Sequence, residues 1–203
     1  MKPNNNIRKI AITGGIGSGK STVAAILREK GFAVFSCDDI YKEVVHSDEY
    51  LSAMKMRFSA EYFNENGEID RKKLAKDVFE KEQVRLAVNA ISHPLIMRRL
   101  YEYMENADGN VVFAEVPLLF ECGFENMFDG VLVVFSEKQK RVEYIKQRDG
   151  LRDDEIEKRM QSQFDYESEE AKKKYVACSA YLLDNSGSLS ELIERVGVYL
   201  QSV

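Results

Sequence analysis

The sequence has 203 residues, of which 44% are hydrophobic and 31% charged, and its formal net charge is −5. This composition is typical of a globular domain, and the acidic balance argues against the basic surface that nucleic-acid binding requires. No run of about 18 apolar residues predicts a membrane span, and residues 1–6 contain no apolar segment of the kind found in signal peptides. We therefore expect a cytoplasmic protein that binds neither nucleic acid nor membrane and that is a monomer or a weak homo-oligomer.

The first predicted strand, residues 7–13, leads into a glycine-rich loop and then into a helix. The loop reads Gly14-Gly15-Ile16-Gly17-Ser18-Gly19-Lys20-Ser21, which matches the phosphate-binding pattern G-x-x-x-x-G-K-[ST]. Glycines let successive N–H groups curl around an oxyanion, and the helix N-terminus adds partial positive charge. The pattern predicts an ATP phosphate site in which Lys20 contacts the β- and γ-phosphates and Ser21 binds Mg²⁺. The residues expected to hold the nucleotide are Gly15, Ile16, Gly17, Ser18, Gly19, Lys20, Ser21 and Thr22.

Two acidic residues, Asp38 and Asp39, follow the second predicted strand, residues 33–36. The carboxyl ends of parallel strands face the ligand crevice, and a carboxylate beside an acceptor hydroxyl can take its proton. An Asp at this place can equally cap the helix that starts near Ile40. We assign the chemical role to Asp38 and the cap, or a supporting role, to Asp39.

Residues 39–106 show helical periodicity and no strand signal. Within them Pro94 predicts a break, because proline restricts the residue before it. A block of this length between two strands is too long for a simple crossover. It therefore predicts a helical insertion, which in a kinase would cover the acceptor substrate.

Three more strands are predicted at residues 111–116, 130–135 and 181–183. Between the last two, residues 141–163 form a basic helical hairpin of the kind expected of a lid over ATP phosphates. Alternating strands and helices predict an α/β three-layer sandwich with a five-stranded parallel sheet of the P-loop nucleotide kinase type. Insertion and lid would then belong to a single kinase domain, residues 1–203.

Several motifs in order along the chain resemble those of dephospho-coenzyme A kinases. Besides the phosphate loop they are Asp38, Ser92-His93-Pro94, Val116-Pro117-Leu118-Leu119-Phe120-Glu121 and Asp184-Asn185-Ser186-Gly187, with Arg71, Arg159 and Gln163 also fitting. The resemblance implies that ATP·Mg²⁺ phosphorylates the ribose 3′-hydroxyl of dephospho-coenzyme A in the last step of coenzyme A synthesis. The alternatives are another small P-loop kinase, acting on a nucleotide or a small alcohol, and an ATP-binding module without enzyme activity.

The resemblance also implies roles for individual residues. Carried over by position, Asp38, Lys20 and Arg148 are catalytic, with Arg148 as the lid cation, and Asn185 lies near the adenine. The residues implied to contact the acceptor substrate are Asp38, Arg71, His93, Pro94, Leu118, Leu119 and Glu121.

Two positions depart from the family pattern. Ser36 stands where the family has the first Asp of Asp-x-Asp, so a second carboxylate at the metal has to come from Asp39 or Glu115. Tyr144 stands where the first lid helix usually has Arg, which leaves the lid to depend on Arg148 or Arg141.

Overall fold

The computed structural model describes residues 7–203, so residues 1–6, used above to argue against a leader, lie outside the described part. The chain forms two compact units. One comprises Cys37–Tyr103 and is named here the helical unit. The other combines Met104–Val203 with the segment that ends at Ser36, and is named the sheet unit.

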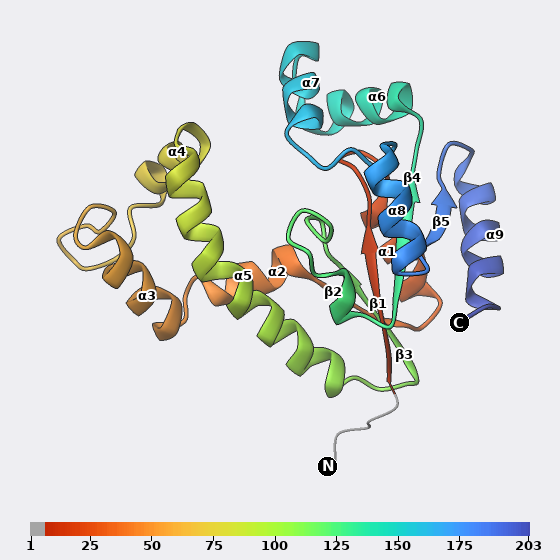
Figure 1. Cartoon of the computed structure of the whole chain (residues 1–203), viewed down its shortest axis with the longest axis horizontal. Helices are drawn as coiled ribbons and strands as arrows, with labels where there is room; N and C mark the ends of the chain where they lie inside the picture. The colour runs from red at the N-terminus through yellow and green to blue at the C-terminus, as the bar shows by residue number, and fades with distance from the viewer. Residues whose placement is uncertain (1–6) are drawn as a thin grey trace. The chain divides into compact units, whose positions relative to one another are not determined.

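The sheet unit is built on five parallel strands within the described residues (Figure 1). They are β1 (Arg8–Thr13), β2 (Ala33–Ser36), β3 (Val111–Glu115), β4 (Gly130–Phe135) and β5 (Tyr181–Asp184). Their order is β2-β3-β1-β4-β5, so β1 is central, and its Ile12 is level with Glu115 of β3 and Leu132 of β4. The predicted five-stranded parallel α/β sheet is confirmed, and the predicted strand bounds differ from these by one residue at most.

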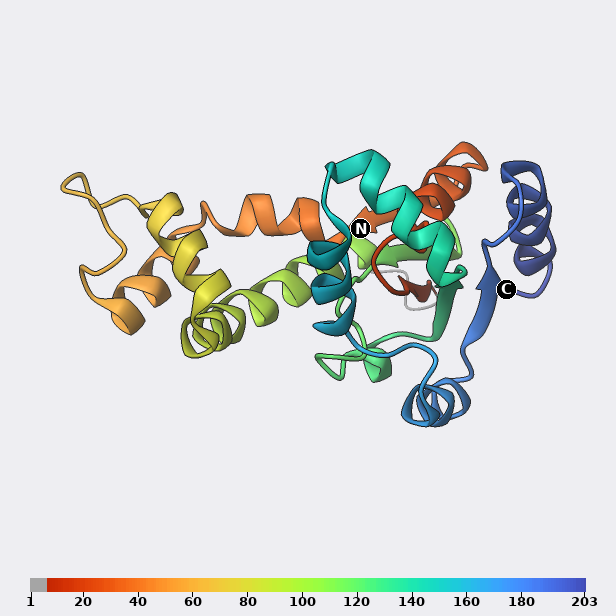
Figure 2. The ribbon, with the colours of Figure 1, turned by 90° about the horizontal axis from the view of Figure 1, so that it is seen from above.

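Both faces of this sheet are covered, which makes three layers. On one face Ile10, Ile12 and Leu132 pack in a core with α1 (Lys20–Glu29) and α9 (Leu189–Leu200). Side chains of the opposite parity, among them Ala11, Val112 and Val133, are equally buried. Figure 2 shows α1 on one side of the sheet and α8 (Glu169–Ala177) on the other. Burial on both faces explains the uninterrupted apolar runs of the strands.

Between β4 and β5 the chain forms a helical hairpin of α6 (Lys138–Asp149) and α7 (Asp153–Gln161). Gly150 ends α6 with φ +65°, a left-handed conformation that glycine adopts without strain. The short helix η1 (Glu125–Met127) lies between β3 and β4. That the hairpin works as a lid stays a prediction.

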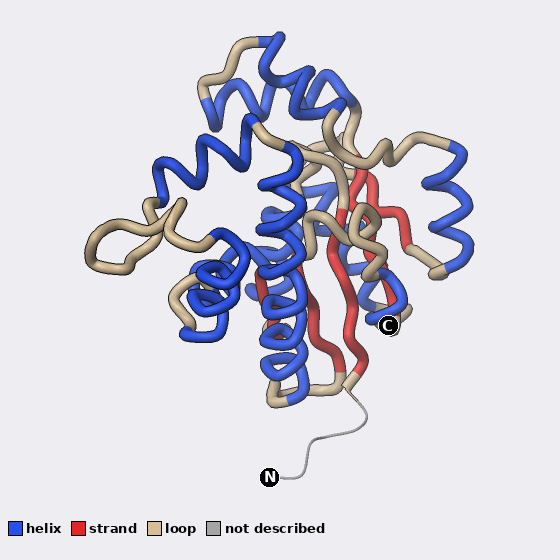
Figure 3. The backbone as a smooth tube through the Cα atoms, turned by 60° about the vertical axis from the view of Figure 1, so that its left-hand side comes forward, coloured by secondary structure: helices blue, strands red, loops and turns tan. Residues whose placement is uncertain are grey.

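The helical unit contains α2 (Cys37–Val44), α3 (Asp48–Phe58), α4 (Arg71–Glu80) and α5 (Glu82–Glu105), the last two residues of α5 belonging to the sheet unit (Figure 3). Tyr50, Met54 and Leu100 are wholly buried in its core. Tyr62, also buried, donates a hydrogen bond of 2.7 Å from its hydroxyl to Asp77. That this unit covers an acceptor stays a prediction.

The predicted break at Pro94 is wrong, because α5 runs without interruption through that residue. A proline inside a helix costs about 3 kcal/mol through its missing N–H and its ring clash. Side chains spaced four residues apart on α5 are buried and offset this cost through packing. They are Val88, Ser92, Ile96, Leu100 and Met104.

None of the helices within residues 7–203 has the length and apolar character needed to cross a membrane.

Candidate active site

The phosphate loop occupies the turn between β1 and α1, and two of its glycines stand where no other residue fits. Gly14 has φ +146°, and a Cβ there would lie 2.2 Å from the carbonyl oxygen of Val134. Gly19 has φ +94°, and a Cβ there would lie 2.1 Å from Nδ2 of Asn185. The close approach of β4 and of Asn185 to the loop therefore depends on glycine.

Lys20, the first residue of α1, directs its side chain back across the loop. Its Nζ donates hydrogen bonds to the carbonyl oxygens of Gly14 at 2.8 Å and Gly15 at 3.1 Å. The ammonium group thus lies beside the backbone that would surround a bound phosphate. That this side chain binds the β- and γ-phosphates stays a prediction.

Asn185, predicted to lie near the adenine, binds the phosphate loop directly. Its Nδ2 donates to the carbonyl oxygen of Ser18 at 2.9 Å, and its own N–H donates to the carbonyl oxygen of Phe135 at 2.7 Å. The turn after β5 is thereby fixed against both the loop and the end of β4.

Ser21 and Glu115 form the pair of oxygen groups that suits a magnesium ion. The Ser21 hydroxyl donates to Oε1 of Glu115 at 2.9 Å, and Glu115 is level with Ser36 at the carboxyl end of the sheet. Mg²⁺ in kinase sites is usually held by one or two carboxylates together with phosphates and water. No cluster of three or more acidic, His or Cys ligands exists within residues 7–203. That Glu115 supplies the second carboxylate at the metal, in place of Ser36, stays a prediction.

The α6–α7 hairpin reaches the phosphate loop through Arg141 and Gln163. Nε of Arg141 donates to the carbonyl oxygen of Ile16 at 2.9 Å, and Oε1 of Gln163 accepts from the Ile16 N–H at 2.8 Å. Burial lowers the pKa of the Arg141 guanidinium. Ile16 was predicted to bind nucleotide, yet both of its backbone groups are engaged by the hairpin.

Arg148, predicted to be the lid cation, forms an ion pair with its neighbour Asp149. Its Nε and Nη2 donate to the two carboxylate oxygens at 2.7 and 2.8 Å, and Arg159 lies 3.8 Å from the same carboxylate. Donating these hydrogen bonds to Asp149 raises the pKa of Arg148, and accepting them lowers the pKa of Asp149. In this arrangement Arg141, rather than Arg148, is the hairpin arginine bonded to the phosphate loop.

The segment after β3 is attached to the base of the hairpin. Oε1 of Glu121 accepts a hydrogen bond of 3.0 Å from the N–H of Phe164. Leu118 is 38% exposed, whereas Leu119 is wholly buried, so of the two side chains only that of Leu118 faces solvent. The hydroxyl of Tyr166, two residues after Phe164, shares a buried hydrogen bond of 2.9 Å with the Thr13 hydroxyl at the end of β1.

In the helical unit, α2 begins at Cys37 and thus earlier than predicted. Asp38 and Asp39 both lie in its first turn, so the expectation that Asp39 caps the helix is wrong. Acidic residues in a first turn are stabilised by the helix dipole. Asp39 is ion-paired with Lys42 at 2.7 Å, and Asp38 is exposed two residues beyond the end of β2.

The remaining predicted substrate residues of the helical unit lie on α4 and α5. Nη2 of Arg71 at the start of α4 lies 2.9 Å from Nε2 of His46. His93 and Pro94 lie within α5, and burial lowers the pKa of His93.

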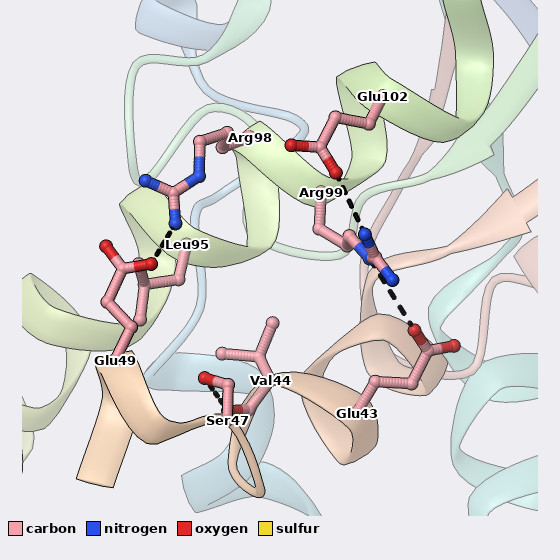
Figure 4. A pocket seen from close by; sticks show the side chains of 8 residues that line it. All are labelled: Glu43, Val44, Ser47, Glu49, Leu95, Arg98, Arg99 and Glu102. Carbon is pink, nitrogen blue, oxygen red and sulfur yellow. Dashed lines mark hydrogen bonds and ion pairs between the residues drawn. The ribbon is translucent and has the colours of Figure 1, made fainter. Parts of the chain in front are cut away.

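The helical unit also contains a pocket of about 310 Å³ that no sequence motif indicated (Figure 4). Arg98 is ion-paired there with Glu49, and Arg99 lies 3.0 Å from Glu102 and 3.9 Å from Glu43. The full lining is Glu43, Val44, Ser47, Glu49, Leu95, Arg98, Arg99 and Glu102. The adjacent pair Arg98-Arg99 was the one signal in the sequence, and it does not reveal which carboxylates it meets.

A parallel sheet of order β2-β3-β1-β4-β5 with a phosphate loop at the end of its central strand defines a P-loop phosphotransferase of the small-kinase type. A family model described as dephospho-CoA kinase matches residues 8–191. The dephospho-CoA kinase of Fusobacterium nucleatum is 34% identical over 98% of this chain and its own whole length, and that of Thermus thermophilus is 37% identical over 90% and 85%.

Solved structures agree with these relatives. A crystal structure from Thermus thermophilus has a TM-score of 0.80 at 35% identity, covering 98% of both chains. The dephospho-CoA kinase from Campylobacter jejuni has a TM-score of 0.66 at 25% identity, covering 96% of both. The chain belongs to the dephospho-CoA kinase family, and the predicted resemblance is confirmed.

Proposed function

We propose that this enzyme transfers the γ-phosphoryl group of ATP, in the presence of Mg²⁺, to the ribose 3′-hydroxyl of dephospho-coenzyme A, giving coenzyme A and ADP. The observation that carries the proposal is the complete phosphate loop, with the Ser21–Glu115 pair beside it, in a member of the dephospho-CoA kinase family. The cytoplasmic location and the monomeric or weakly associating state remain predictions from the sequence.

The phosphates of ATP would lie in the loop between Gly15 and Thr22, where backbone N–H groups and the N-terminus of α1 favour negative charge. Lys20 would leave the carbonyl oxygens of Gly14 and Gly15 and bind the β- and γ-phosphates. Ser21 and Glu115 would hold Mg²⁺. When bound, the ion supplies positive charge that offsets the charge on the transferring group.

On the acceptor side, Asp38 would orient the 3′-hydroxyl and take its proton as the bond to phosphorus forms. Burial lowers the pKa of His93, which favours the neutral imidazole, and in that form one ring nitrogen can donate a hydrogen bond and the other can accept one. The other residues proposed to contact dephospho-coenzyme A are Arg71, Pro94, Leu118, Leu119 and Glu121. Arg148 would act as a lid cation only after separating from Asp149.

The test is ADP release from ATP·Mg²⁺ with and without dephospho-coenzyme A, against AMP, CMP and adenosine as other acceptors. We expect strong stimulation by dephospho-coenzyme A alone. Equal or greater stimulation by another acceptor would contradict the proposal, as would ATP binding without acceptor-dependent turnover.

A further inference from the structure

We propose that Arg141 and Gln163 form a bracket on Ile16 and act as positioning residues for the phosphate loop. In this view the bracket fixes the two peptide groups on either side of Ile16 in the orientation that binds phosphate. The inference rests on the proposed function, because it assigns these residues a part in nucleotide binding by that same site.

The two halves of the bracket come from opposite ends of the α6–α7 hairpin. Arg141 lies in the first turn of α6, and Gln163 lies two residues beyond the end of α7. They meet at one residue of the loop, where Gln163 accepts from the N–H of Ile16 at 2.8 Å and Arg141 donates to its carbonyl oxygen at 2.9 Å. Each bond spans more than a hundred residues of sequence, so each depends on the tertiary fold.

Gln163 controls the peptide group between Gly15 and Ile16. In a planar trans peptide the N–H and the carbonyl point in opposite directions, and no cis peptide occurs within residues 7–203. Holding the Ile16 N–H outward therefore turns the Gly15 carbonyl the other way. That carbonyl accepts from Nζ of Lys20 and from the N–H of Ser18, both at 3.1 Å. Gln163 thus holds the group that positions Lys20.

Arg141 controls the next peptide group, between Ile16 and Gly17, by the same geometry. Its bond to the Ile16 carbonyl directs the Gly17 N–H away from the hairpin. The N–H groups of a phosphate loop are its phosphate ligands, so the orientation of this N–H matters for binding.

Close packing keeps the bracket in contact with the loop. A Cβ on Gly15 would lie 2.4 Å from Nη2 of Arg141, and a Cβ on Gly17 would lie 2.9 Å from the Arg141 carbonyl oxygen. The carboxylates of Asp165 and Glu167 lie near Arg141, and its side chain donates a hydrogen bond to the Ile16 carbonyl oxygen. The absence of a Cβ at Gly15 and Gly17 therefore lets Arg141 of the hairpin approach the loop closely.

The consequence is that nucleotide affinity depends on the hairpin. If a loop without the bracket adopts the binding conformation only part of the time, the apparent Kd rises in proportion to the lost fraction. Loss of one hydrogen bond of this kind corresponds to an increase of about 5- to 10-fold in the Kd for the nucleotide.

The experiment compares Gln163→Met, which removes the acceptor at nearly constant shape, with Gln161→Met as its matched control. Gln161 is exposed, and its side-chain amide donates a hydrogen bond to Glu157 at 3.3 Å. Calorimetry with ADP·Mg²⁺ is expected to show about 5- to 10-fold weaker binding for Gln163→Met and no change for Gln161→Met. The KM for dephospho-coenzyme A is expected to stay within about 2-fold in both.

A second arm uses Arg141→Met and the double variant Arg141→Met/Gln163→Met. Because both residues act through Ile16, the double variant is expected to lose less affinity than the product of the two single losses. Equal Kd values for Gln163→Met and Gln161→Met, or fully multiplicative losses, would overturn the bracket. A wild-type protein that binds ADP but shows no turnover with dephospho-coenzyme A would overturn the proposed function instead. The comparison of Kd values for ADP would still show whether Gln163 and Arg141 position the phosphate loop.

Discussion

The phosphate loop and the pocket of the helical unit are built in opposite ways. In the loop, the hydrogen bonds from Lys20, Asn185 and Arg141 all end on backbone carbonyl oxygens, and the Ser21–Glu115 bond is the contact between two side chains. In the pocket, the arginines are held by carboxylate side chains, as Arg99 is by Glu102 and Arg98 by Glu49. A site made of backbone requires a fixed pattern of glycines, whereas a site made of side chains can be assembled from many pairs of residues.

The two constructions also differ in what they contribute to stability. Arg98 and Glu49 are 58% and 57% exposed, and exposed ion pairs contribute little to folding. The helical unit is instead stabilised by its buried apolar residues, such as Met54 and Leu100. Its charged pocket can therefore change without loss of the fold.

The most severe test of the backbone-built site is Lys20→Ala. We expect the rate of phosphoryl transfer to fall by about 10²–10³-fold, because one charge contact to the transition state is removed. Steady-state kinetics with dephospho-coenzyme A measures the loss. Lys30→Ala, at the exposed end of α1, serves as the control and should keep full activity.

Asp38→Asn tests whether the helical unit supplies chemistry of its own. We expect kcat to fall by about 100-fold, because a general base is lost, while ATP affinity stays nearly unchanged. Kinetics and calorimetry measure these two quantities separately. A normal kcat in this variant would remove Asp38 from the mechanism.

Glu115→Gln tests whether Glu115 compensates for Ser36 at the metal. The amide keeps an acceptor for Ser21 but loses the charge, so the Mg²⁺ concentration for half-maximal activity should rise about 10-fold. A Mg²⁺ titration of activity measures the change. If Asp39→Asn raised the Mg²⁺ concentration needed for half-maximal activity and Glu115→Gln did not, Asp39 would be the second carboxylate at the metal.

Acid should weaken the helical unit through Asp77. Hydrogen bonds from Lys81 and then Tyr62 lower the pKa of this carboxyl below its ordinary value of 3.8. The charged carboxylate of Asp77 therefore stabilises the fold fully above pH 3.8. This stabilisation is lost as the pH falls through the lower pKa that Asp77 has in the folded protein. In urea unfolding, Asp77→Asn should be less stable than wild type at pH 7, and the gap should narrow at pH 3 and below. A gap that is constant with pH would show that the charge of Asp77 is not what stabilises the fold.

The smallest effect is expected for Arg98→Met in the pocket. The free energy of unfolding should change by less than about 1 kcal/mol, as for exposed ion pairs, and kcat should stay the same. Urea unfolding and steady-state kinetics measure the two quantities. A rise in the KM for dephospho-coenzyme A would instead indicate that the pocket binds the acceptor substrate. The pocket and the phosphate loop would then both be substrate-binding sites.

The same contrast explains what the sequence could predict. The five strands and the phosphate loop follow from local patterns, because apolar runs and glycines carry their meaning within a few residues. The bracket on Ile16 could not be predicted, because Arg141 and Gln163 lie more than a hundred residues from it in the sequence. A single Arg or Gln in a sequence does not indicate which residue it will bond. The continuation of α5 through Pro94 was missed because burial of a helix stripe overrides a local signal.

The discontinuous make-up of the sheet unit determines when its sheet can form during synthesis. Among the described strands, β1 pairs with β3 and β4 and β2 pairs with β3, so Arg8 meets its partner Val111 about a hundred residues later. Residues 37–103 leave the ribosome before any strand of the sheet has a neighbour to bond. The apolar β1 must therefore wait, unpaired, while the whole helical unit is made, and such long-range pairing slows folding and exposes the strand to aggregation.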